Sequence, residues 1–216
     1  MRHRTRTGGR RAFVTFAAAA GFLAAAAIVS CGHGDAPVPA ASSAPVAGVV
    51  DSALPISELE RRFRVGLDSV STLDSGAAPS RDAVVTRFVR ALETRDTARL
   101  RSMAITRAEF AYLYYPSTIY VRPPYETGPE TLWRLMAARS ASGLSRVVAR
   151  VGGAPIRMLG YDCDATPKIE GANRYHEQCY LRYRRTAADS VERRRLFGSI
   201  MERDGRFKFV GYANDF

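Results

Sequence analysis

The sequence predicts an α+β fold, with helices first and an antiparallel sheet after them. Apolar residues recur at helical spacing through much of the region from 81 to 151, as in "AVVTRFVRALE". After residue 154 the apolar period changes to two, which is typical of strands. Asp204-Gly205 joins the last two such stretches and is among the strongest short hairpin signals. Helices followed by a meander of strands is the element order of an α+β domain.

The first 30 residues have the parts of a secretory signal. A basic head, "MRHRTRTGGRR", precedes an apolar stretch, "AFVTFAAAAGFLAAAAIVS", and Cys31 follows. The stretch is nearly long enough to span a membrane. Alanine dominates it, so its insertion energy is weak and cleavage is favoured over a retained spanning anchor. In either case the positive-inside rule places the rest of the chain outside the cytoplasm.

Ile28-Val29-Ser30-Cys31 resembles the lipobox of bacterial lipoproteins. The resemblance implies cleavage before Cys31 and a diacylglycerol group on its sulfur, which would hold the protein at the membrane. Two acyl chains are enough for stable attachment. Arg10-Arg11-Ala12-Phe13-Val14 also resembles a twin-arginine export motif. The export route stays open, as does the choice between the inner and the outer membrane.

The net charge is +11, but five arginines lie in the first eleven residues, and removing that leader leaves +6. This excess gives a modest attraction to anionic surfaces. Nucleic acid is not an expected partner, because the chain is placed outside the cytoplasm.

Residues 31–56 are rich in Ala, Pro, Ser and Gly and predict a flexible tether after the signal at 1–30. Residues 57–79 predict a short helix, with Ser57 and Glu60 as a capping box, and then a loop. The folded domain is expected over 80–216.

Within this domain the apolar spacing predicts a helix over about 81 to 94, and Asp96 caps a second, shorter one. Thr106 and Glu109 form a capping box that opens a third. "STIYVRP" alternates like a short strand, and Thr127-Gly128-Pro129-Glu130 is a helix start.

Four strands are predicted at about 155–163, 175–186, 192–202 and 206–213. With Asp204-Gly205 as a two-residue turn, Ile200 faces Phe209 and Gly198 faces Gly211. Two opposed glycines leave a gap that allows a sharp bend or a close helix approach, unless the pairing is a coincidence.

The order of elements resembles the nuclear-transport-factor-2-like, or cystatin-like, cone fold. "AVVTRFVRALETRDTARLRSM" and "GRFKFVGY" carry the resemblance, which covers about residues 80–216. It implies N-terminal helices packed on a curved sheet of four to five antiparallel strands. The family includes enzymes and binding proteins, so the fold leaves the function open.

Cys163 and Cys179 predict a disulfide, since an even pair outside the cytoplasm is commonly oxidised. Two small buried thiols are the alternative. No zinc motif is present, and His176 is the only histidine of the domain, so neither a metal nor a cofactor is expected.

An acid–base site would draw on Asp162, His176 and Glu177, although these also suit a polar surface. Strand alternation places Glu177 on the more apolar face. Aromatic residues that suit a pocket wall or a core edge equally well are Tyr112, Tyr115, Tyr120 and Trp133.

Six arginines lie around one hairpin end: Arg182, Arg184, Arg185, Arg193, Arg194 and Arg195. They suit an anionic envelope component or a protein partner. They equally suit a solvated hairpin compensated by Asp189 and Glu192. A homodimer also stays open.

The sequence therefore predicts an exported, lipid-anchored envelope protein with a small binding or accessory domain that has no catalytic role. A pocket enzyme of the lyase, isomerase or hydrolase type is the alternative.

Overall fold

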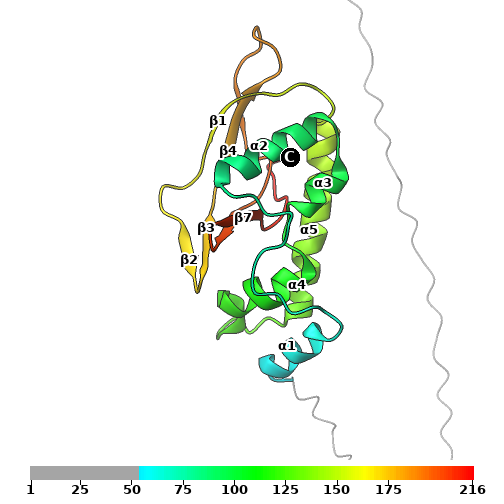
Figure 1. The fold of residues 1–216 in the computed structure, drawn as a ribbon, viewed down its shortest axis with the longest axis vertical. Helices are drawn as coiled ribbons and strands as arrows, with labels where there is room; N and C mark the ends of the chain where they lie inside the picture. The colour runs from blue at the N-terminus through cyan, green and yellow to red at the C-terminus, as the bar shows by residue number, and fades with distance from the viewer. Residues whose placement is uncertain (1–53) are drawn as a thin grey trace, which may run out of the picture. The chain divides into compact units, whose positions relative to one another are not determined.

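The computed structural model describes residues 54–216, which belong to one compact unit that starts at residue 51. This part is α+β, as predicted, and it combines helices with two open antiparallel sheets (Figure 1). The predicted signal at 1–30, Cys31 and nearly all of the tether at 31–56 lie outside the described residues.

The first helices begin mostly where the sequence places them. Helix α2 (Arg81–Glu93) is capped by the Ser80 side chain, and α3 (Thr97–Ser102) by Asp96. Helix α1 (Ile56–Arg64) differs, because it starts after Pro55 without a side-chain cap, so the predicted Ser57–Glu60 box is wrong. The segment from 57 to 79 is part of the body of the domain, since Phe63, Leu73 and Ala77 are buried in the core.

The predicted capping box of Thr106 and Glu109 is confirmed at the start of α4 (Arg107–Glu109). The chain continues in a wider π turn, η1 (Phe110–Tyr114), and then in two 3₁₀ turns, η2 (Tyr115–Ser117) and η3 (Ile119–Val121). The strand predicted from "STIYVRP" is therefore wrong. The Thr118 hydroxyl accepts a hydrogen bond from the Tyr120 amide and starts a helical turn instead.

Helix α5 (Pro129–Arg150) begins with proline at its first position, as predicted. It is the longest helix of the described part, and neither it nor any other helix there has the unbroken apolar length that a membrane crossing needs.

Within residues 54–216, seven short strands take the place of the four predicted ones. They are β1 (Arg157–Asp162), β2 (Lys168–Glu170), β3 (Asn173–His176), β4 (Tyr180–Arg184), β5 (Glu192–Arg194), β6 (Ile200–Arg203) and β7 (Arg206–Phe209). The strand predicted over 175–186 is split into β3 and β4, because Gln178 has a left-handed backbone with φ 48°. The strand predicted over 192–202 is likewise split into β5 and β6.

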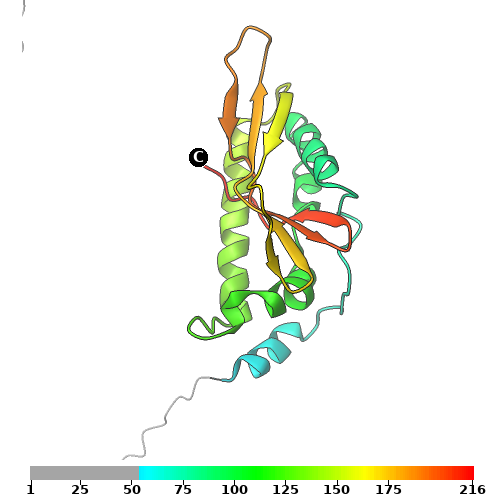
Figure 2. The ribbon, with the colours of Figure 1, turned by 90° about the vertical axis from the view of Figure 1, so that its left-hand side faces the viewer.

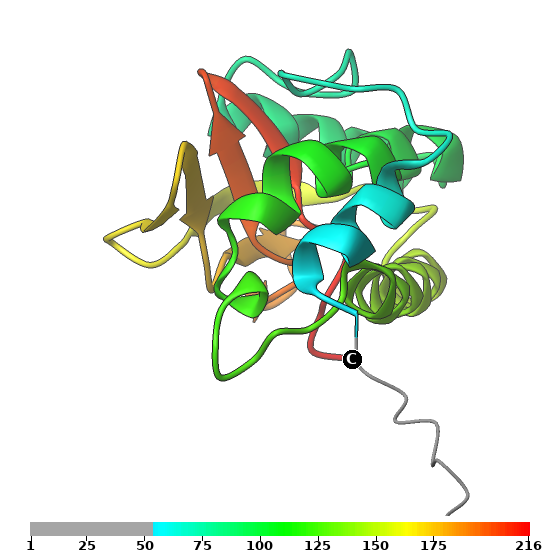
Figure 3. The same ribbon diagram turned by 90° about the horizontal axis from the view of Figure 1, so that it is seen from below.

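The strands form two sheets with orders β1-β4-β5 and β2-β3-β6-β7. Figure 2 shows the two groups one above the other along the length of α5. In Figure 3, α5 is seen end-on, and the β2–β3 hairpin projects on the opposite side.

The predicted register of the last hairpin is confirmed, because Ile200 pairs with Phe209 across β6 and β7. Beyond the hairpin, the Gly198 amide donates to the Gly211 carbonyl at 2.9 Å. A Cβ at Gly211 would lie 3.2 Å from the Ser140 side chain of α5. The two glycines thus allow α5 to approach the chain closely at the point where the hairpin leaves the sheet.

Cys163 and Cys179 form the predicted disulfide. It joins the end of β1 to the break between β3 and β4, where Cys179 is 1% exposed. Below it, Phe88 packs against the rings of Phe197 and Phe209 at 5.2 and 5.6 Å. A second aromatic group surrounds Phe110 near α1 and η1. The two cores hold α5, η1 and the strands in place, and the candidate site lies between these elements.

Candidate functional site

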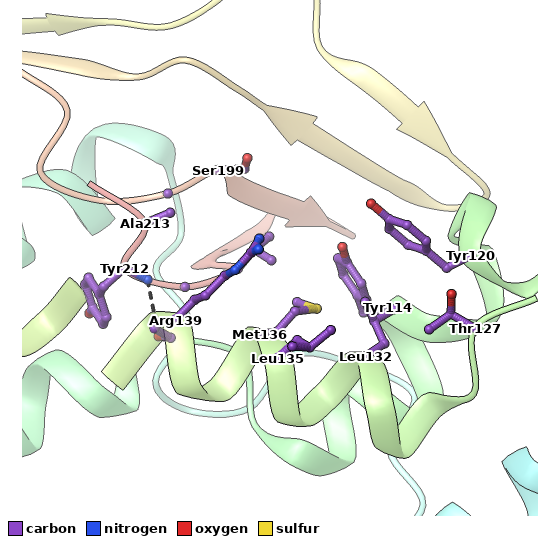
Figure 4. A pocket seen from close by; sticks show the side chains of 14 residues that line it. Tyr114, Tyr120, Thr127, Leu132, Leu135, Met136, Arg139, Ser199, Tyr212 and Ala213 are labelled. Atoms are coloured by element: carbon purple, nitrogen blue, oxygen red, sulfur yellow. Dashed lines mark hydrogen bonds between the residues drawn. The ribbon is translucent and has the colours of Figure 1, made fainter. Parts of the chain in front are cut away.

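A groove of about 370 Å³ lies beside α5 (Figure 4). Its apolar wall comes from Leu132, Leu135 and Met136 of the helix. Its other residues come from the end of η1, from η3 and from the backbone around Gly198 and Gly211. Most of its lining is therefore apolar, and a few polar tips are placed along it, as is usual for small-molecule sites.

The polar tips of the groove point into a common space. In Figure 4 the Arg139 guanidinium and the hydroxyls of Tyr114 and Tyr120 extend to the same side of α5. Within residues 54–216, none of these three groups forms a hydrogen bond or an ion pair with another side chain or with the backbone. They are therefore free to bind a ligand.

A smaller recess of about 150 Å³ adjoins the groove and shares Tyr114, Tyr120, Ser199 and Val210 with it. Its remaining walls are mostly polar and include Lys168, Glu170, Tyr175 and Glu177. Groove and recess together form one site that is apolar at one end and charged at the other.

Several segments far apart in the chain build the recess. Tyr114 is the last residue of the π turn, a geometry that is often found at functional sites. Its ring meets the edge of the Tyr175 ring from β3 at 5.7 Å. Lys168 and Glu170 come from the neighbouring strand β2 and are joined by an ion pair of 2.7 Å.

The field inside the recess is negative. Burial raises the pKa of the Tyr114 hydroxyl well above its ordinary value, and the nearby Glu170 carboxylate adds to the rise. Burial also raises the pKa of Tyr175, with a smaller contribution from Glu170. The hydrogen bond to Glu170 raises the pKa of Lys168. All three groups therefore stay protonated at neutral pH.

Of the three acid–base candidates, only Glu177 lies in this site. Asp162 is half exposed on β1 and pairs with Arg193 at 2.5 Å and with Arg182 at 3.9 Å. His176 points to the other face of β3, where its ring stacks on Phe207. The three side chains do not form one catalytic group.

His176 is held between two partners. Arg81 lies 3.1 Å from Nδ1, and Glu202 lies 3.0 Å from Nε2. A guanidinium can only donate, so Nδ1 accepts from Arg81 and the Nε2 hydrogen is given to Glu202. Because both ring nitrogens are engaged and the side chain is 12% exposed, His176 ties α2 to β3 and β6 as a structural residue.

The predicted aromatic wall is divided between the site and the core. Tyr120 lines both the groove and the recess. Tyr115 is fully buried, and its hydroxyl donates to the Thr127 carbonyl at 2.7 Å. Tyr112 lies under the Arg64 guanidinium, and Trp133 lines a second hollow of about 360 Å³ that borders the groove at Met136 and Ser140. Of the four aromatic residues, only Tyr120 therefore lines the candidate site.

The six arginines of the hairpin are largely bound within the domain. Arg193 and Arg194 pair with Asp162 and Glu192, and Arg195 pairs with Asp215 at 2.6 Å. Arg184 and Arg185 donate to backbone carbonyls of Ala187 and Val151. Arg182 is the most loosely held, at 3.9 Å from Asp162. Three carboxylates, Asp162, Glu192 and Asp215, therefore compensate part of the charge of the six arginines.

Among the charged and aromatic residues of the site, sequence reasoning did not select Arg139, Lys168, Glu170 and Tyr175. Tyr175 could have been found, because it is two residues from Glu177 and shares its strand face. Arg139 could not, because one exposed arginine on a helix carries no signal of its own.

The part of the chain from 54 to 216 brings together no group of three His, Cys, Asp or Glu side chains that could hold a metal ion. Cys31 lies outside that part. Comparison of the chain with family models, with curated proteins and with solved structures finds no match.

Proposed function

We propose that this chain is an exported, lipid-anchored envelope protein whose domain binds a small amphipathic molecule without transforming it. The basic head, apolar stretch and lipobox-like segment before Cys31 support the export and the anchor. The groove and recess support the binding role. The domain would then act at the membrane surface, outside the cytoplasm, at the end of a tether.

The observation that carries this proposal is the continuity of an apolar groove with a polar recess. Leu132, Leu135 and Met136 offer apolar surface to the body of a ligand, which contributes roughly 25 cal/mol per Å² buried. The unpartnered hydroxyls of Tyr114 and Tyr120 would orient its polar end. An amphipathic molecule can place its apolar body in the groove and its polar end in the recess.

Binding is favoured over catalysis because the acid–base candidates are dispersed. A general acid and base must reach the same substrate atoms, within about 3 Å of them. Asp162 and His176 are engaged in other contacts, which leaves Glu177 without a second catalytic group from the predicted set.

A pocket enzyme is the second candidate, and one observation favours it. Glu177 shares the recess with Tyr114 and Tyr175, whose raised pKa values keep their hydroxyls protonated at neutral pH, so that they can donate hydrogen bonds. A carboxylate base beside hydroxyl donors suits proton abstraction next to a carbonyl. Recovery of the bound ligand unchanged after prolonged incubation distinguishes a binding protein from this enzyme.

We further infer that the two sheets are the halves of one bent, cone-like sheet. In support, β3 and β4 are separated only by residues 177–179, and Gly198 still bonds to Gly211 beyond the β6–β7 ladder. The resemblance to the nuclear-transport-factor-2-like fold is proposed on the same grounds. The groove would then lie between the sheet and the long helix, where such folds hold their ligands.

Leu135→Arg tests the groove. Leu135 is 53% exposed and lines the groove, so the change should leave the fold intact and introduce a charge into the apolar wall. We expect the full chain to bind a neutral amphipathic dye such as Nile red, and the variant to bind it about tenfold more weakly, measured by fluorescence titration.

Leu159→Arg is the matched control, because Leu159 is 46% exposed on β1 and does not line the groove. It should bind the dye as the natural chain does. Equal losses in both variants, or no dye binding by the natural chain, would contradict the proposed groove.

Cys31→Ala tests the anchor. In bacterial cells labelled with radioactive palmitate, we expect the natural chain to carry label and to sediment with membranes. The variant should lose the label, because its side chain has no sulfur to carry diacylglycerol. Ser30 and the apolar stretch are unchanged in this variant, so unaltered labelling would show that the lipid is not on Cys31.

A further inference from the structure

The recess has the lining of a site for an organic cation. Three tyrosines, Tyr114, Tyr120 and Tyr175, surround it together with the carboxylates of Glu170 and Glu177. The Tyr114 and Tyr175 rings, which both line it, meet edge to face at 5.7 Å. Aromatic faces and carboxylates attract ammonium groups, and cages of this kind are a known way to hold quaternary ammonium ligands.

The charges of the recess are not balanced. The Glu170 side chain is 9% exposed and is neutralised by Lys168 at 2.7 Å. The Glu177 carboxylate has no hydrogen bond or ion pair within the described range 54–216. One negative charge is therefore left without a partner. Burial is the main cause of the raised pKa of Tyr114, and the hydrogen bond to Glu170 is the main cause of the raised pKa of Lys168; the carboxylates of Glu170 and Glu177 add to both shifts, which agrees with excess negative charge here.

The volume of the recess sets the size of the group that enters. About 150 Å³ accommodates a small ammonium or trimethylammonium group, while the body of the ligand requires the larger groove next to it. The groove contains the positive charge of Arg139, and Arg139 does not line the recess. A cation is thus directed to the recess and away from the groove.

We propose that the recess binds the positively charged end of the ligand, an ammonium or quaternary ammonium group, between the tyrosine rings and Glu177. This inference rests on the proposed binding function and specifies the chemical class of the ligand.

The test compares three ligands with the same apolar body, 4-phenylbutyl-trimethylammonium, 4-phenylbutanol and 4-phenylbutyrate, by titration calorimetry on the full chain. We expect the ammonium ligand to bind about tenfold more tightly than the alcohol, and the carboxylate to bind most weakly. Glu177→Gln should remove most of the preference for the ammonium ligand and leave the affinity for the alcohol unchanged.

Two further variants make the test specific. Asp204→Asn removes one negative charge at an exposed turn that does not line the recess, and it should change neither affinity. Lys168→Met removes the resident cation and should increase the affinity for the ammonium ligand several-fold, an increase that damage to the fold would not produce.

The outcomes separate the two proposals. If none of the three ligands and no neutral dye binds, the proposed function is wrong. If the alcohol or the carboxylate binds as tightly as the ammonium ligand, the groove binds amphipathic molecules but the cation site is overturned. A preference for the ammonium ligand that survives Glu177→Gln also overturns it.

Discussion

Lys208→Met is expected to lower the free energy of unfolding by about 3–5 kcal/mol, because it leaves a buried carboxylate without its counter-charge. The Lys208 ammonium is fully buried on β7 and donates to both oxygens of Glu109, at 3.0 and 2.8 Å. It also pairs with Asp74 at 2.7 Å. Glu109 itself is 1% exposed, so water cannot replace the lysine. Urea denaturation followed by circular dichroism measures the loss.

Lys168→Met is the matched control, since Lys168 is the only other lysine of the chain. The Lys168 side chain is 47% exposed, although the Glu170 carboxylate that it pairs with is 9% exposed. We therefore expect Lys168→Met to cost clearly less than Lys208→Met, in which both partners are buried. If the two variants lost a similar free energy of unfolding, burial of the Lys208–Glu109 pair would not be the cause of the loss in Lys208→Met. A loss below about 1 kcal/mol for Lys208→Met would show that Glu109 finds another partner or protonates.

Gly143→Ala is expected to destabilise the domain by about 3 kcal/mol, although alanine is the better helix former. Gly143 lies inside α5, and a Cβ there would overlap with the Tyr212 carbonyl oxygen. At this place Asn214 donates to the Gly143 carbonyl, and the Tyr212 amide donates to the Ser140 hydroxyl. The side chain would push the C-terminal segment off the helix, and thermal unfolding reports the lower melting temperature.

Ser145→Ala, two residues further along the same helix, provides the comparison. Ser145 is exposed, so its change to alanine follows helix propensity and should be neutral or slightly stabilising. If Gly143→Ala were also neutral or stabilising, helix propensity would outweigh the contact and the close approach of α5 would be wrong.

The local parts of the fold could be predicted because they depend on neighbours in the chain. The Ser80 and Asp96 caps and the Thr106–Glu109 box each need only a side chain and an amide three residues away. The Ile200–Phe209 register follows from the two-residue turn at Asp204-Gly205. In these places local preference and tertiary structure agree.

The division of the sheet could not be predicted, because period-two alternation continues across the break at Gln178. "STIYVRP" also alternates, yet the Thr118 hydroxyl turns it into a 3₁₀ helix. Alternation records which faces are buried, and it does not record where the backbone changes direction.

The candidate site was predictable only in part, for a similar reason. Glu177 could be selected from residue type and strand face, and Tyr120 from residue type, and both lie in the recess. Tyr115 has the same chemistry as Tyr114, but one step along a helical turn carries it into the core. Which tyrosine faces a ligand depends on the packing around it, which residue type does not reveal.

The sequence by itself determined the starts of α2 to α5, the last hairpin, the cysteine pair and the α+β class, since each arises from short-range backbone chemistry or from composition. Only the tertiary structure decided that the strands form two sheets, that Lys208 is buried with Glu109, and that Tyr114 meets Tyr175 beside Glu177. These are contacts between residues about sixty to a hundred positions apart. They form because many apolar side chains share one core, and no single stretch of sequence contains that information.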